Sequence, residues 1–190
     1  MSKAKLLIIG AGEHGRSVAE AAELSGEFEI IGFLDDSVAT GQVVFEYPVL
    51  GSTAKLLPYL EPCDQAIVAI GNNQRRETLT ARLIEVGISL ATIVHPKAFL
   101  SPRALIAPGS AVMAGAIIGT EAQLGIGVIV NCGAVVDHHA KVGDFGHLGV
   151  NACMAGGSML GTKSWIQAGS SLGYGIVVPD GVTLAPGTAL

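Results

Sequence analysis

The sequence predicts a small α/β domain of the nucleotide-binding type followed by a parallel β-helix. Three observations predict this fold class. A glycine-rich loop separates an apolar run from an amphipathic segment near the N-terminus, the strand and helix patterns stop near residue 92, and a large aliphatic residue then occupies every sixth position from Val94 to Leu190. A period of six fits neither an α-helix nor a lone strand but is typical of a solenoid. We therefore expect two domains, residues 1–92 and 93–190.

Alternating strand and helix patterns fill the first ninety residues. Strands are expected at 4–9, 28–34 and 66–70, and helices at 16–24 and 77–86. The buried face of the first helix should carry Val18, Ala21, Ala22 and Leu24, and Gly87 should end the second helix. With about three strands, the sheet is smaller than the one that a dinucleotide requires. A mononucleotide such as UDP is therefore a better expectation than NAD.

The loop Gly10-Ala11-Gly12-Glu13-His14-Gly15 follows a strand and opens a helix, and Asp35 comes twenty residues after Gly15. This is the context of a nucleotide site, because glycines let the backbone approach a pyrophosphate and a helix N-terminus offers free N–H groups. The alternative is a tight turn with a solvated Asp35. His14 either faces the phosphates or caps the turn, and Arg16 reaches either a phosphate or solvent.

The second helix begins near two asparagines and two arginines. Asn72 and Asn73 are interpreted as helix N-caps or as substrate contacts. Arg75 and Arg76 are expected to lie on a solvated face.

The β-helix is expected to have about five coils of three hexads each, so that residues 18 apart stack at about 4.8 Å. All seventeen aliphatic residues of the period should point inward. This periodicity also explains the mean hydropathy of +0.53, since no window of about 20 residues reads as a membrane span. The apolar content is therefore assigned to a core, and no integral membrane segment is expected.

Charge and cysteine content narrow the functional classes. The net charge of −5, without a basic cluster, gives no footprint for nucleic acid. Cys63, Cys132 and Cys153 are scattered and are interpreted as small buried residues rather than a disulfide framework. The start of the chain, Met-Ser-Lys-Ala-Lys, runs into a strand without a cleavable signal, which favours a cytoplasmic protein.

Polar residues interrupt the β-helix in the segment from Asn131 to His139. With a coil of 18 residues, Gly156 and Gly157 should stack on His138 and His139. Two glycines beside an imidazole leave room for a thin acyl chain and an N–H aimed at its carbonyl oxygen. The alternative is a pair of surface histidines beneath a glycine turn.

A zinc site is one alternative for these histidines, because gamma-class carbonic anhydrases bind zinc through histidines of stacked coils. Here the residues one coil from His138 are Thr120 and Gly156, and Pro102 lies two coils earlier. No third histidine falls in register. The sequence therefore predicts no metal site.

Several motifs together resemble those of the NeuD/PglD group of sugar acyltransferases. They are the GxGxHG loop, the FLDD segment at 33–36, the IGNN segment at 70–73, the Ile93-Val-His-Pro96 junction and the NxGAVVDH segment at 131–138. The resemblance covers the whole chain. It implies a left-handed β-helix, a homotrimer with active sites between subunits, and acetyl-CoA as a cosubstrate rather than a permanently bound cofactor.

The resemblance also implies roles for individual residues. His138 is the general base with Asn131 beside it, and His147, Gly156 and Ala168 contact acetyl-CoA. The UDP-sugar contacts are Gly10, Gly12, Glu13, His14, Gly15, Asp35, Asp36 and Gly71. The family usually has an acidic residue after the catalytic histidine, where this chain has His139. Asp137 is therefore the expected orienting partner.

The implied reaction is direct transfer of acetyl to the 4-amino group of a UDP-linked 4-amino-4,6-dideoxy sugar. An imidazole suits the removal of the amine proton near neutral pH. Two alternatives stay open: O-acetylation of sialic acid, and a trimeric scaffold that senses a nucleotide without catalysis. Relatives continue beyond the position of Leu190, so a shortened form of a longer chain is also expected.

Overall fold

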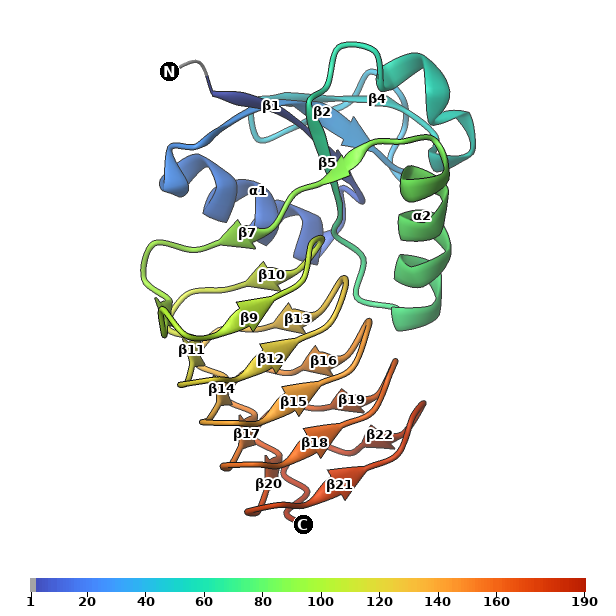
Figure 1. Cartoon of the computed structure of the whole chain (residues 1–190). Coiled ribbons are helices and arrows are strands. Elements are labelled where there is room, and N and C mark those ends of the chain that lie inside the picture. The colour runs from blue at the N-terminus through green and yellow to red at the C-terminus, as the bar shows by residue number, and fades with distance from the viewer. Residues whose placement is uncertain (1–2) are drawn as a thin grey trace.

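The computed structural model describes residues 3–190, and Figure 1 shows an α/β domain stacked on one end of a β-helix. The first sheet has the strand order β3-β4-β2-β1-β5-β6, with parallel pairing except between β3 and β4. Its strands are β1 (Ala4–Ile9), β2 (Phe28–Leu34), β3 (Val43–Val44), β4 (Tyr47–Gly51), β5 (Gln65–Val68) and β6 (Ser89–Leu90). Residues 1 and 2 of the expected first domain lie outside the described part.

Helices cover both faces of this sheet. Helix α1 (Glu13–Ser25) packs between one face and the β-helix, in a cluster that includes Val18, Phe33 and Ile93. Helix α2 (Asn73–Glu85) covers the other face together with the short 3₁₀ helices η1 (Thr53–Lys55) and η2 (Leu57–Tyr59). Figure 1 shows α2 descending along one edge of the β-helix.

The sequence predicted β1 and β2 with their observed bounds, but other elements differ. Helix α2 begins four residues earlier than expected, because the Asn72 side chain caps it by accepting from the Arg75 N–H. Strands β3, β4 and β6 were not predicted. Two of them, β3 and β6, contain only two residues each, and β6 pairs with β5, from which helix α2 separates it in the chain. The assignment of Leu24 to the buried face was wrong: it is 57% exposed and lies two positions beyond Ala22, the last buried residue of α1.

The second part of the chain is a left-handed β-helix made of three parallel sheets. The sheet facing the first domain contains β7 (Ile93–Val94), β10 (Ala111–Val112), β13 (Ile129–Val130), β16 (His147–Leu148), β19 (Trp165–Ile166) and β22 (Thr183–Leu184). The second sheet contains β8 (Phe99–Leu100), β11 (Ile117–Ile118), β14 (Val135–Val136), β17 (Cys153–Met154) and β20 (Ser171–Leu172). The third contains β9 (Leu105–Ile106), β12 (Gln123–Leu124), β15 (Lys141–Val142), β18 (Met159–Leu160) and β21 (Val177–Val178).

The register of the coils follows the period of six. Paired residues are 18 apart, as in the pairing of Val136 with Ile118 and with Met154. Each aliphatic residue of the period except Leu190 belongs to the core or packs against it. Leu190 is 53% exposed, which corrects the expectation that all seventeen point inward. Burial of each large aliphatic contributes about 1.5–3 kcal/mol to folding.

Arg76 joins the two parts of the molecule. Its side chain is 1% exposed, and its guanidinium donates to the carbonyl oxygens of Gly127, Phe145, Ile70 and Gly71 and to the Asn73 Oδ1. The expectation that Arg76 lies on a solvated face was wrong. Its helical position faces the turns of the β-helix, whose carbonyl groups need donors when they are buried. Arg75, one residue earlier, is half-exposed.

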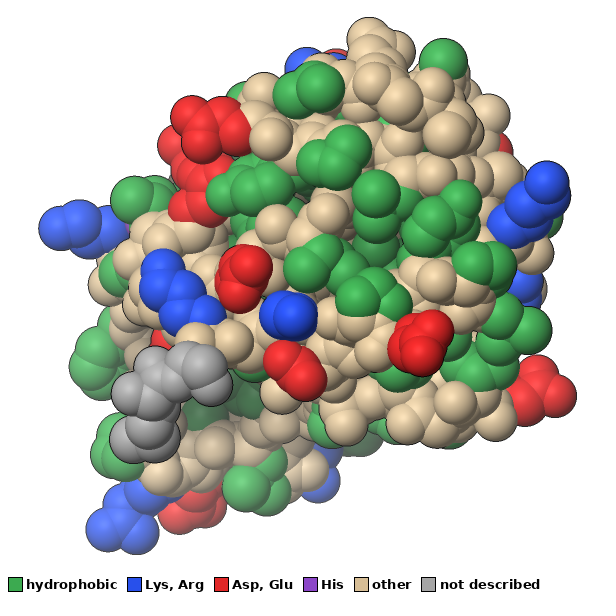
Figure 2. All heavy atoms as spheres, turned by 90° about the horizontal axis from the view of Figure 1, so that it is seen from above, with side chains coloured by type: hydrophobic (Ala, Val, Ile, Leu, Met, Phe, Trp, Pro, Cys, Tyr) green, Lys and Arg blue, Asp and Glu red, His purple; other side chains and the backbone are tan. Residues whose placement is uncertain are grey.

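The cysteines and the charged side chains are distributed over the molecule. All three cysteines are free within residues 3–190, and only Cys63 is buried, so the expectation of burial was wrong for Cys132 and Cys153. No helix of the described chain is both long and apolar enough to cross a membrane. On the face seen in Figure 2, Lys and Arg side chains lie among acidic and apolar ones rather than in one basic patch.

Candidate active site

The glycine-rich loop forms one side of a pocket of about 360 Å³. Its lining comes from the carboxyl ends of β1, β2 and β5 and includes the predicted residues Gly10, Gly12, Glu13, His14, Asp35, Asp36 and Gly71. Gly12 is the N-cap of α1 without a side-chain cap, so free N–H groups of the first turn face the pocket. Gly15 lies buried behind the loop against the Gly10 carbonyl. The exposed Arg16 donates to the Ala11 carbonyl oxygen, at 3.3 Å.

The two aspartates at the end of β2 organise neighbouring loops. Asp35 accepts from the backbone N–H groups of Ala11, Ser37 and Val38 at 2.7–2.9 Å. Burial alone raises the pKa of Asp35, but these three donors outweigh it and hold the pKa below its ordinary value. Asp35 is therefore an anion that fixes the glycine loop.

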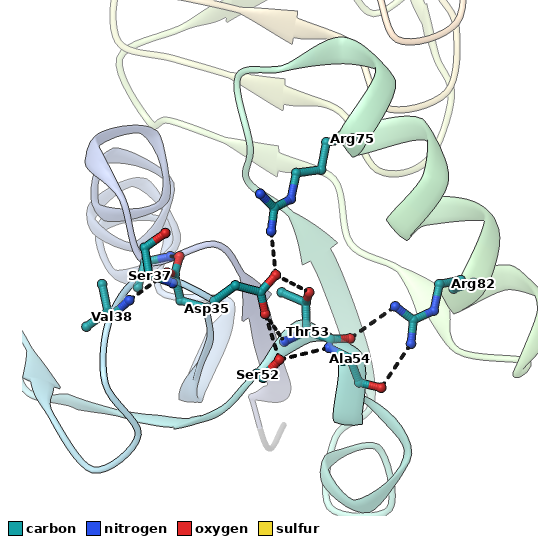
Figure 3. Close-up of polar contacts among 10 residues, drawn as sticks. Asp35, Ser37, Val38, Ser52, Thr53, Ala54, Arg75 and Arg82 are labelled. Atoms are coloured by element: carbon teal, nitrogen blue, oxygen red, sulfur yellow. Dashed lines mark hydrogen bonds and ion pairs between the residues drawn. The ribbon is translucent and has the colours of Figure 1, made fainter.

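Asp36 is held by several neighbouring residues of the chain. It accepts from the Ser52 hydroxyl and from the Thr53 N–H and hydroxyl at 2.7–2.9 Å, and it pairs with Arg75. Figure 3 shows Arg75 and Arg82 of α2 reaching toward the segment 52–54. Arg82 donates there to the Thr53 and Ala54 carbonyl oxygens. These contacts hold one wall of the pocket in place.

Two histidines with unpaired ring nitrogens lie where the first domain meets the β-helix. His14 belongs to the glycine-rich loop, and His147 belongs to β16. The Nε2 of His14 and the Nδ1 of His147 are buried and hydrogen bond to none of the described residues. Burial, followed by the charge of Arg76, lowers the pKa of His14 to about 4 and that of His147 to about 3. Both side chains are therefore neutral near pH 7. His14 can offer a hydrogen bond to a ligand but no positive charge to a phosphate.

Asn131 contacts His147 rather than His138 within one protomer. Its Nδ2 lies 2.8 Å from the His147 Nε2 and donates to the Leu148 carbonyl oxygen. The His147 ring also stacks on Trp165, with ring centroids 4.9 Å apart. The residue expected beside the base thus belongs to the cluster that faces the first domain. Ala168 is exposed in the turn between β19 and β20, at a different corner from His138.

His138 and Gly156 meet at the corner between the second and third sheets. A methyl group added to Gly156 would lie 2.4 Å from the His138 Cε1 and 2.5 Å from its Nε2. The Gly157 N–H donates to the His138 carbonyl oxygen, whereas the Gly156 N–H donates to no backbone carbonyl of residues 3–190. The stacking of glycine on histidine expected from the coil length is confirmed. It leaves an imidazole beside a free N–H.

The orienting contact of His138 involves a residue that the sequence analysis did not identify. The Nδ1 atoms of His138 and His139 lie 3.1 Å apart, and the His139 Nε2 lies 3.1 Å from the Glu121 Oε2. Glu121 could have been found by counting 18 residues back from His139. The expected partner Asp137 accepts from the His138 backbone N–H at 2.7 Å, and its Oδ2 is 3.8 Å from the His138 Nε2.

Known proteins of one family resemble this chain over nearly its whole length. A model of the PglD N-terminal domain matches residues 5–83. The acetyltransferase domain of PglB from Neisseria gonorrhoeae is 38% identical, with a TM-score of 0.93, over 99% of this chain and 91% of that chain. The same domain in complex with acetyl coenzyme A is 35% identical, with a TM-score of 0.82, over 98% of each chain. The chain belongs to the NeuD/PglD family of sugar acetyltransferases.

A third similar structure is that of a different protein, PerB. PerB from Caulobacter crescentus, in complex with CoA and GDP-perosamine, is 30% identical, with a TM-score of 0.92, over 100% of this chain and 89% of that chain. No sequence among curated proteins matches significantly.

In this NeuD/PglD-family chain, the predicted residues occupy separate regions of one protomer. The nucleotide-type pocket with His14 and Gly71 lies beside the β-helix face that carries His147. His138 and Gly156 lie at the corner between the other two sheets. Among the described residues, no group of three or more His, Cys, Asp or Glu side chains could hold a metal ion.

Proposed function

We propose that this protein transfers acetyl from acetyl-CoA to the 4-amino group of a UDP-linked 4-amino-4,6-dideoxy sugar. The observation that carries the proposal is the contact between His138 and Gly156, which puts a base and a free N–H at one point of the surface. Membership of a sugar acetyltransferase family supports the same chemistry.

The transfer is direct in this mechanism. The sugar amine attacks the thioester carbon, a C–N bond forms, and the C–S bond breaks. His138 takes the amine proton as general base, and the departing CoA thiolate finally takes up a proton to leave as the thiol. The Gly156 N–H stabilises the developing oxyanion, an effect of about 3–4 kcal/mol for one donor in other enzymes.

We assign nucleotide binding to residues 1–92 and acetyl transfer to residues 93–190. The free N–H groups at the start of α1 suit a pyrophosphate, and we assign Asp35 and Asp36, which also line the pocket, to the ribose or base. Because the pocket is built on one βαβ unit and its flanks, it suits a mononucleotide sugar better than a dinucleotide.

We also propose a homotrimer whose active sites lie between subunits. One protomer keeps its pocket in the first domain and His138 at a corner of the β-helix, so a neighbouring copy has to supply one of them. The two sheets that face away from the first domain carry exposed apolar side chains, including Phe99, Ile117, Leu105 and Met159. Such ladders suit burial against other copies of the same chain.

The first experiment measures release of CoA thiol with acetyl-CoA and a panel of acceptors. The panel contains UDP-, GDP- and dTDP-linked 4-amino sugars and free sialic acid. We expect the UDP-linked amine to have the highest kcat/KM. Preference for the GDP-linked sugar, which is bound in the PerB structure, would overturn the nucleotide assignment but not the reaction. Acetylation of sialic acid alone, or no turnover with any acceptor, would overturn the reaction.

The second experiment tests the base. His138→Ala should retain both ligands but lower kcat by about 10²- to 10⁴-fold. Full activity of His138→Ala at saturating substrate would eliminate this mechanism.

Mixed oligomers test the shared site. Inactive His138→Ala protein is mixed, under conditions that exchange subunits, with protein whose pocket is blocked by Gly12→Asp. Recovery of activity in the mixture is expected, because some interfaces regain both intact halves. A stable, active monomer in sedimentation would contradict the arrangement.

A further inference from the structure

We propose that Glu121 is the carboxylate that positions the proposed base His138, and that it acts through His139. This inference rests on the proposed function, because it concerns how the base of that reaction is held. Glu121 and His139 occupy the same corner position of successive coils, 18 residues apart. His138 is the residue next to His139 in the chain.

The hydrogen bonds of this chain determine where the protons lie. An ionised carboxylate only accepts, so the His139 Nε2, which lies 3.1 Å from the Glu121 Oε2, has to be the donor. A neutral His139 protonated at Nε2 has an unprotonated Nδ1, which can only accept. The 3.1 Å contact between the two Nδ1 atoms then requires that His138 donates from its own Nδ1.

This assignment leaves the His138 Nε2 unprotonated, as a general base needs. The Nε2 is also the ring nitrogen that lies against Gly156, 2.5 Å from the position that a methyl group there would take. Glu121 therefore selects the tautomer of His138 whose free lone pair faces the glycine. A chain of two imidazoles carries the effect of the carboxylate to His138.

The backbone supports a selected role for this pair. Glu121 and His139 adopt left-handed φ angles of 59° and 58°, whereas the next two residues of the same column are Gly157 and Gly175, at φ 66° and 67°. Glycine adopts this conformation without steric cost, and other residues do not. Glu121 and His139 thus keep side chains in left-handed conformations where these side chains contact each other, and the next two positions of the column hold glycine.

Asp137 does not provide an equivalent contact. Its Oδ1 accepts from the His138 backbone N–H, and its Oδ2 is 3.8 Å from the Nε2, beyond hydrogen-bonding distance. Asp137 faces the nitrogen that takes up the proton and can stabilise the imidazolium, but it does not fix the tautomer. The titratable side chain of Tyr174 also lies at this corner, and its ring centroid is 6.4 Å from that of His138.

The expected effect is moderate, since more than half of the Glu121 and His139 side-chain surfaces is exposed. Exposed pairs contribute weakly, so loss of Glu121 should lower kcat by about 5- to 10-fold, far less than loss of the base itself.

The test compares Glu121→Gly, His139→Gly and Glu121→Gln in the full chain. The glycine variants remove the side chain and relieve the left-handed strain, so Tm should stay unchanged or rise by about 2 °C while kcat falls. A merely structural role would lower Tm and kcat together. Asn151→Gly is the matched control, because Asn151 also has a left-handed φ, of 55°, at another corner, and this variant should keep its kcat.

Nitrogen-15 NMR of the histidine rings gives a readout independent of turnover. Near pH 8, the wild-type protein should show His138 protonated mainly at Nδ1, and Glu121→Gly should shift it toward the Nε2-protonated form. If Glu121→Gly and His139→Gly keep the tautomer and kcat of the wild type while His138→Ala is inactive, the relay is refuted and the proposed function stands. If His138→Ala is fully active, the proposed function itself fails.

Discussion

The Cα of Gly156 lies against the imidazole ring of His138, so closely that any side chain at residue 156 would overlap the ring. The contact exists because the two residues are 18 apart and therefore occupy equivalent places on successive coils. Gly156 has no left-handed φ, so its lack of a side chain is explained by the ring and not by its backbone conformation. This relationship leads to the first prediction.

Gly156→Ala should lower kcat by about 10²-fold with little change in Tm. The added methyl would displace the half-exposed His138 ring, and a misplacement of about 1 Å can cost that much in rate. Thiol release at saturating substrates measures kcat. The double variant with His138→Ala should be no slower than His138→Ala alone, since the methyl acts through the ring. Additive losses would show that Gly156 acts independently of His138.

Gly12→Ala should weaken nucleotide-sugar binding while leaving acetyl-CoA affinity and Tm unchanged. A methyl there meets no atom within 4 Å, so the empty protein tolerates it, but it projects where a phosphate would approach the helix N-terminus. Isothermal titration with each ligand checks this. Gly15→Ala is the contrasting variant: its methyl would lie 1.9 Å from the Gly10 carbonyl oxygen and should cost at least about 3 kcal/mol of stability. Equal loss of both ligands in Gly12→Ala would contradict the assignment of two sites.

Arg76→Met should lower the free energy of unfolding by about 3–5 kcal/mol. The five N–H donors of Arg76 are all engaged, and their loss leaves buried carbonyl groups unpaired between α2 and the β-helix. Arg75→Met, at a half-exposed neighbour, should change it by no more than about 1 kcal/mol. Urea denaturation followed by circular dichroism measures both. Similar values for the two variants would contradict the role of Arg76 in joining the domains.

Stability of the ligand-free protein should fall as the pH decreases from 7 to 5. The pKa values of His14 and His147 are about 4 and about 3 in the folded state, below the ordinary value of 6.5. Below about pH 6.5 the two histidines of the unfolded chain therefore bind protons, whereas those of the folded chain stay neutral. The stability present above that pH is lost as the pH falls toward the pKa values of the folded state. Each histidine should contribute about 1–2 kcal/mol to the loss by pH 5.

Urea midpoints at the two pH values check this dependence. His147→Gln should flatten the pH dependence because glutamine does not titrate. An unchanged slope in both His147→Gln and His14→Gln would mean that other groups cause the loss.

Much of the β-helix could be predicted from the sequence because its contacts are periodic. Each inward residue packs against residues 18 before and 18 after, so the spacing of Ile118, Val136 and Met154 alone fixes their register. The same counting predicted that Gly156 lies on His138. In the first domain, β1 and β2 were predicted because apolar residues dominate each of these short segments.

Other features depend on contacts between segments that no local pattern relates. Arg76 is buried because α2 docks on turns of the β-helix 51 and 69 residues away. Asn131 contacts His147 because the side chain of one coil bends toward the next, which strand periodicity does not specify. Strand β6 pairs with the edge of β5, from which helix α2 separates it in the chain.

The sequence by itself thus determined the coil register, the domain order and the pairing of His138 with Gly156, since these follow from spacing along one chain. Tertiary structure decided that His14 and His147 are neutral and that Arg76 joins the domains. It also decided that the carboxylate linked to the His138 ring through His139 is that of Glu121 and not that of Asp137. Burial and side-chain direction govern these properties. Both emerge only when the two parts of the chain pack and each side chain settles among neighbours far away in sequence.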